Sequence, residues 1–231
     1  MTVIVLHLVF IGLIFGLPFT LIQVLHHRYQ VGYPLLVVGM MTFTLSLFIR
    51  TALLWVLQNS PLVNSPLIEA TLVGLIIGFV DIGTVAFGYA WLARSTVYRP
   101  QAVLIGIGHA LPEMIFVGLW VIWIALGLAK QGAAPVGLSK VGVNAIREMV
   151  GSLAPLALHI TLSWLVLQTF LRNEAAWFFQ AILWCAMVFG TETLFYRGST
   201  QPEQLVGIWW MLVTLINAII FWRIKPPFVW Q

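Results

Sequence analysis

Two residue types suited to proton or metal chemistry, His109 and Glu113, stand inside an otherwise apolar stretch of membrane-spanning length from Leu104 to Trp123. A spacing of four residues places both side chains on one helix face, about 5–6 Å apart at Cβ. An ionisable group at bilayer depth costs roughly 3 kcal/mol on insertion scales, so each group needs a partner or a function. Pro112 lies between them and cannot donate a backbone hydrogen bond, which loosens the helix beside the polar groups.

A second apolar stretch repeats the pattern with His159 and Ser163, and Pro155 stands one turn earlier. We expect His109, Glu113 and His159 to face one another inside a helix bundle. Two histidines and a carboxylate suit Zn or another divalent metal. They would equally suit an acid–base pair acting on a bound water. Either histidine could instead be an axial ligand of a haem or pigment, or a simple hydrogen-bonded tie between helices.

The composition places these groups in a membrane. Of 231 residues, 61% are hydrophobic and 8% are charged, whereas a soluble domain carries about 25% charged residues. We therefore expect an all-α polytopic protein forming one integral membrane domain over residues 1–231. Its basic residues are scattered through loops, which argues against nucleic-acid binding. The expected surroundings are the lipid bilayer and other membrane protein subunits.

Windows of about 19 residues predict a bundle of about seven transmembrane helices. The first lacks a basic leader and a small-residue cleavage site, so we expect it to be retained. Residues 129–147 are Gly-rich and weakly apolar, and they suit either an interfacial helix or a re-entrant loop. The predicted spans are 3–25, 34–57, 67–94, 101–128, 148–171, 175–195 and 205–223.

The basic residues in the loops favour one orientation. One side carries six, Arg28, Arg94, Arg99, Arg172, Arg223 and Lys225, and the other carries four, Lys130, Lys140, Arg147 and Arg197. This bias predicts the N-terminus outside and the C-terminus in the cytoplasm.

Two further polar residues lie within predicted spans. Asp81 is followed by Gly83, Thr84 and Gly88, which suggests a close-packing seam with an accessory hydrogen bond. Arg50 lies about two turns from the end of its span, where it could snorkel to the interface or pair with Glu69.

Four segments in order along the chain carry a family resemblance: FIRTALL with Arg50, GFVDIGTVAFGYAWLA with Asp81, GIGHALPE with His109 and Glu113, and MVGSLAPLALHITLSWLV with His159. In this order they resemble the YhfC-like intramembrane proteases, distant relatives of the CAAX-prenyl-type glutamic proteases. The resemblance implies a prokaryotic plasma membrane and a site formed by Asp81, His109, Glu113 and His159. In that family a glutamate of the third helix is thought to activate water while the histidines support it.

The same comparison shows departures from the family pattern. Val80 and Asp81 stand where the family has paired glutamates, and Thr84 stands where it has an arginine. Gly151 and Ser152 replace a Glu-Arg pair. Loss of a positioned general base removes about 10²–10⁴-fold of rate. The resemblance therefore predicts a catalytically degenerate protein that serves as a binding or accessory subunit. An active protease that uses Asp81 or Glu113 as the base remains the alternative.

Overall fold

The computed structural model is a helical bundle that describes residues 2–61, 63–130 and 138–225. Within these ranges seven helices are long and apolar enough to cross a membrane, and no residue forms a strand, which confirms the predicted fold class. The elements are α1 (Thr2–Tyr29), α2 (Pro34–Gln58), α3 (Pro66–Phe87), η1 (Gly88–Leu92), α4 (Arg99–Lys130), α5 (Leu138–Arg172), α6 (Ala175–Gly198) and α7 (Pro202–Arg223).

Local sequence signals account for several helix starts. Proline occupies the first turn of α2, α3 and α7, where its missing N–H leaves no helical bond unmade. The side chain of Ser65 caps α3 by accepting a hydrogen bond from the backbone N–H of Ile68. These signals explain why most predicted spans lie within a few residues of the observed helices.

Two predicted boundaries differ from the structure. The third span does not remain α-helical to residue 94, because it changes at Gly88 into the π-helical turn η1. The fifth helix begins at Leu138 rather than 148, so residues 138–147 belong to α5. They form neither a separate interfacial helix nor a re-entrant loop. Residues 131–137 of the ambiguous segment lie outside the described residues.

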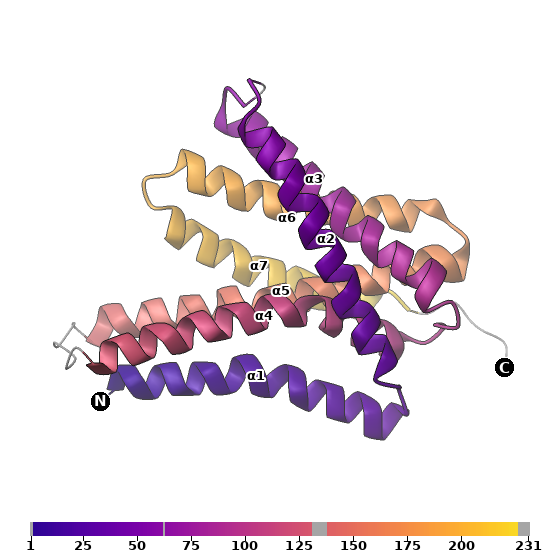
Figure 1. The fold of residues 1–231 in the computed structure, drawn as a ribbon, viewed down its shortest axis with the longest axis horizontal. Helices are drawn as coiled ribbons and strands as arrows, with labels where there is room; N and C mark the ends of the chain where they lie inside the picture. The colour runs from indigo at the N-terminus through magenta and orange to yellow at the C-terminus, as the bar shows by residue number, and fades with distance from the viewer. Residues whose placement is uncertain (1, 62, 131–137, 226–231) are drawn as a thin grey trace.

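Helix α5 occupies the centre of the bundle. Its span Leu153–Arg172 has 72% of its most apolar window buried, the largest share among the described spans. Figure 1 shows α1, α4 and α5 running side by side, with α2 crossing over them. Helix α3 packs against α6, and α7 packs against α5 and α6.

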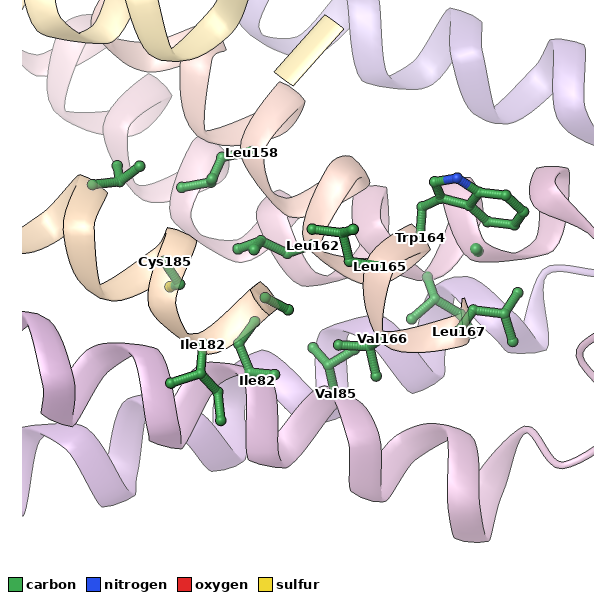
Figure 2. Packing of buried hydrophobic residues seen from close by; sticks show 14 of the residues in the cluster. Ile82, Val85, Leu158, Leu162, Trp164, Leu165, Val166, Leu167, Ile182 and Cys185 are labelled. Carbon is green, nitrogen blue, oxygen red and sulfur yellow. The ribbon is translucent and has the colours of Figure 1, made fainter. Parts of the chain in front are cut away.

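The apolar interior forms two clusters. The larger one joins α3, η1, α4, α5, α6 and α7, and Figure 2 shows α5 side chains from Leu158 to Leu167 meeting Ile82 on α3 and Ile182 on α6. Cys185 lies in this cluster as a buried free thiol. The second cluster joins α1 to α4 and α5. Helices α4 and α5 contribute to both clusters and therefore link the two halves of the bundle.

Glycine sets the closest helix contacts. A Cβ at Gly78 would lie 2.7 Å from the carbonyl oxygen of Ile182, and one at Gly74 would lie 3.0 Å from Cα of Gly190. These glycines form a close α3–α6 contact one to two turns before Asp81. Of the predicted seam residues after Asp81, Gly88 is closely packed, since a Cβ there would lie 2.7 Å from Thr42 Cγ2 on α2. Gly83 is not, because a Cβ there would meet nothing within 4 Å.

A second close contact joins α2 to α4 beside the predicted polar site. A Cβ at Gly39 would collide with the carbonyl oxygen of Ile105 and lie 2.8 Å from Cα of Gly108. Both atoms belong to the backbone and cannot rotate away. The helices can approach this closely only because neither glycine carries a side chain.

Gly39→Ala is expected to destabilise the protein by about 1–3 kcal/mol, the usual range for overpacking a closely packed contact. Gly83→Ala is the matched control, since it adds the same methyl group in open space and favours the helix. Reversible unfolding in detergent–lipid micelles measures both. Equal stabilities of the two variants would show that the α2–α4 contact is looser than described.

Candidate functional site: a polar pocket among α2, α4 and α5

The structure brings His109, Glu113 and His159 together, as the sequence predicted. The imidazole rings of His109 on α4 and His159 on α5 lie 4.7 Å apart between centroids. The His159 Nε2 atom lies 3.7 Å from Glu113 Oε2. Both histidines are enclosed, with 1% and 2% of their surface exposed, whereas the Glu113 side chain is 32% exposed. Glu113 therefore forms the open side of the pocket.

Close contact between α4 and α5 makes this geometry possible. A Cβ at Gly106 would lie 2.6 Å from Cα of Ile160 and 2.7 Å from the carbonyl oxygen of His159. The absence of a side chain at Gly106 lets the two backbones meet one turn from His109. The His159 ring can then reach across to the face of α4 that carries His109 and Glu113.

Thr42 on α2 fixes the orientation of His109. The Thr42 hydroxyl donates to the carbonyl oxygen of Gly39 at 2.8 Å, and its oxygen lies 3.0 Å from His109 Nδ1. Because the hydroxyl has one proton, which is already donated, Nδ1–H of His109 donates to Thr42. The Nε2 atom of the neutral ring then carries a lone pair. This atom is buried and has no hydrogen-bond partner among the described residues.

His159 Nε2 is a second buried atom without a hydrogen-bond partner in the described part of the chain. A buried polar atom left unsatisfied costs about 1–3 kcal/mol, and such atoms are uncommon in folded proteins. Two of them beside one carboxylate form a site that can bind a polar group or a water.

Asp81 forms a second polar cluster between α3 and α2. It accepts a hydrogen bond from the Ser46 hydroxyl, and Arg50 Nη1 lies 3.3 Å from Asp81 Oδ2. Asp81 is 1% exposed. The expectation of a seam residue with an accessory hydrogen bond was therefore incomplete, because Asp81 is also one partner of a buried ion pair.

The suggested pairing of Arg50 with Glu69 was wrong. Glu69 accepts two hydrogen bonds from Arg197, at 3.1 and 2.7 Å, which tie the start of α3 to the end of α6. Arg50 turns instead towards Asp81, because the carboxylate lies at the same depth on the adjoining helix. Neither snorkelling nor the short loop between α2 and α3 decides its position.

Phe43 separates the two polar clusters. Its ring lies edge-on to His109, with centroids 5.4 Å apart, and the Arg50 guanidinium carbon lies 5.2 Å from its centroid. The ion pair is therefore close to the histidines without a hydrogen bond to either of them. Asp81 and the His109 pocket are neighbours rather than one continuous hydrogen-bonded site.

Sequence reasoning missed Thr42 and Ser46. A signal was available, because Thr42, Ser46 and Arg50 recur every four residues and so share one face of α2. Ser163, in contrast, lies away from the pocket. Its hydroxyl donates to the carbonyl oxygen of Ala102 at 2.8 Å and accepts from Tyr89 at 2.7 Å.

The donor set at the pocket does not by itself form a metal centre. Within residues 2–61, 63–130 and 138–225 no three or more His, Cys, Asp or Glu side chains are arranged to hold a metal ion. The zinc ligands His109, Glu113 and His159 therefore remain a prediction. Comparison with known protein families, curated proteins and solved structures found no match for this chain.

The orientation of His109 gives a direct test of the pocket. We expect neutral His109 to carry its proton on Nδ1, because Thr42 can only accept there. The ¹⁵N chemical shifts of the labelled ring distinguish the two tautomers. Thr42→Val should weaken the preference, since valine has a similar shape but no hydroxyl oxygen. An Nε2–H tautomer in the unsubstituted protein would contradict this hydrogen-bond assignment.

A double-mutant cycle tests the Asp81–Arg50 pair. Asp81→Asn or Arg50→Met alone should each destabilise by about 3–5 kcal/mol, since removal of one partner leaves the other charge buried. The double variant should lose much less stability than the sum of the two single losses, because neither charge remains buried. Unfolding free energies measure all three. Strictly additive losses would show that the two side chains do not interact.

Proposed function

We propose that this integral membrane protein binds a polar group of a ligand or partner at His109, Glu113 and His159 and does not cleave it. The observation that carries the proposal is the pair of unsatisfied, buried Nε2 atoms beside the Glu113 carboxylate. A purely structural role for the histidines would leave both atoms paired within the bundle. Only His159 has a charged neighbour, Glu113 at 3.7 Å, and neither Nε2 atom has a hydrogen-bond partner among the described residues, which favours a site completed by another group.

The surroundings of Asp81 favour binding without catalysis. In the YhfC-like resemblance, Asp81 stands at the position of an acid that activates water. Here its oxygens contact Ser46 and Arg50, and Phe43 stands between Arg50 and the histidines. A general base must reach the proton that it removes, directly or through one water. Val80, Gly151 and Ser152 cannot replace the acidic and basic side chains of the family pattern.

An accessory role in a membrane complex fits this pocket. Glu113 opens the site towards the outside of the bundle, and Phe116 and Trp120 on the same helix are highly exposed. A segment of another membrane protein lying against α4 could place a polar group beside Glu113 while its apolar side chains cover these rings. This arrangement would satisfy the polar atoms without admitting water.

One observation favours the alternative of an active protease. His159 Nε2 lies 3.7 Å from Glu113 Oε2, which is close enough for the two groups to share a water and act as acid and base. In this alternative Glu113 rather than Asp81 activates the water. The two functions differ in whether a peptide bond is broken.

A cleavage assay separates them. We expect the purified protein in lipid bilayers to leave transmembrane and soluble peptide substrates intact, as judged by mass spectrometry. Glu113→Gln and Asp81→Asn should give the same result as the unsubstituted chain. Cleavage that disappears in either variant would overturn the proposal and support the protease.

A second measurement tests binding. Proteins and small molecules that co-purify in mild detergent are quantified for the unsubstituted chain and for His109→Gln. We expect a bound species to fall about tenfold, the loss that follows from removing a hydrogen bond worth about 1.4 kcal/mol. Thr71→Val is the control, because Thr71 is exposed and bonds only to Leu67 of its own helix. Identical profiles for a folded His109→Gln variant would argue against a binding pocket.

A further inference from the structure

A cation at the start of α4 lies outside the histidine pocket. The guanidinium carbon of Arg99 is 3.6 Å from the ring centroid of Phe221 on α7 and 5.4 Å from that of Trp164 on α5. Trp164 is fully buried, and Figure 2 shows it at one end of the row of α5 side chains. The two rings hold the guanidinium at the end of the bundle and leave its N–H edges to find other partners.

Those edges have no hydrogen-bond partner among the described residues. Arg99 Nε and Nη2 are both buried and unsatisfied. Together they form the edge of the guanidinium that can donate two parallel hydrogen bonds to two oxygens of a phosphate or carboxylate. Arg99 as a whole is only half-buried, so part of its side chain reaches the surface of the bundle.

Two polar side chains close to Arg99 or Trp164 in the sequence are also unsatisfied within the described chain. Gln168 follows Trp164 by one turn of α5 and is fully buried, and its Nε2 amide has no hydrogen-bond partner in the described chain. The Oγ1 atom of Thr96, three residues before Arg99, is in the same state at 5% exposure. The α4 N-terminus adds the positive end of its dipole. All of these features favour the binding of an anion beside Arg99.

The six carboxylates whose side chains the structure describes do not supply that anion. Five of them each contact another side chain. The sixth, Glu203, lies at the start of α7, at the opposite end of the bundle from Arg99. A buried charge without a counter-ion costs several kcal/mol, so a negative group from outside this set would stabilise the protein. The five carboxylates and their partners are Glu69 with Arg197, Asp81 with Arg50, Glu113 with His159, Glu174 with Trp177, and Glu192 with Trp210.

The location indicates where the anion comes from. The ends of α1, α3, α5 and α7 and the start of α4 lie at the right of Figure 1, at one edge of the membrane-spanning segments. Exposed Trp91 and Trp222 mark this edge as an interface, since tryptophan favours headgroup depth. The basic residues of this end are Arg28, Arg94, Arg99, Arg172, Arg223 and Lys225.

We propose that Arg99, with Gln168 and Thr96, binds the phosphodiester of an anionic phospholipid headgroup. Nε and Nη2 of Arg99 donate to two phosphate oxygens, and the apolar rings of Phe221 and Trp222 lie beside the start of the acyl chains. This site is independent of the histidine pocket and of the function proposed for it.

Native mass spectrometry of the full chain in detergent tests the site. The probes are dioleoylphosphatidylglycerol, dioleoylphosphatidylcholine and inorganic phosphate. We expect phosphatidylglycerol to bind in preference to phosphatidylcholine, and Arg99→Gln to weaken it about tenfold or more, as for loss of a hydrogen bond to a charged group. Arg94→Gln is the matched control, because it removes an exposed charge at the same end whose Nε donates to the carbonyl oxygen of Ala90, four residues earlier.

Arg99→Lys serves if Arg99→Gln fails to fold. Lysine keeps the positive charge but cannot donate two parallel hydrogen bonds from one planar group. The Arg99→Lys variant should therefore bind phosphatidylglycerol more weakly than the unsubstituted chain. Equal phosphatidylglycerol binding by the unsubstituted chain and either folded Arg99 variant would overturn the proposal. So would full displacement of the lipid by inorganic phosphate, which would indicate a site for a free anion.

Discussion

The contact between α2 and α4 at Gly39 and Gly108 is the constraint on which the polar pocket depends. No side chain separates the two backbones there, so the first turn after Gly39 brings Thr42 against His109. Gly106 performs the same function towards α5 and brings His159 to the same place. Lipid offers no hydrophobic force between helices, and close backbone packing with hydrogen bonds is what holds such a bundle together. The glycines therefore set both the fold and the site.

Polar groups in this bundle differ in how fully they are paired. Asp81, Arg50 and Ser46 satisfy one another, as do Glu69 and Arg197 at one end of the bundle. The cost of burying Asp81, Arg50 and Ser46 is offset within the protein, whereas Arg197 is exposed. The histidine pocket and the Arg99 end keep buried atoms without partners in the described chain. This contrast separates structural polar groups from candidate binding groups without reference to any relative.

The sequence predicted much of this arrangement because a membrane limits the choices. Long apolar runs had to be helices, and the four-residue spacing of His109 and Glu113 placed them on one face. The partner of Arg50 was not predictable in the same way, since it depends on how α2 and α3 rotate about their axes. Gly83 and Gly39 look alike in the sequence, yet only Gly39 meets a neighbouring backbone. The role of Thr42 required the fold, because the residue lies 67 positions from His109.

The distance between the two buried imidazole rings tests the account most directly. His109 and His159 can be labelled with ¹⁵N and ¹³C in a chain whose His7, His26 and His27 are replaced by glutamine, reconstituted in lipid bilayers. Solid-state NMR dipolar recoupling should detect a contact between the rings, as expected for centroids 4.7 Å apart. Absence of that contact in a protein that remains folded would contradict a shared pocket between α4 and α5.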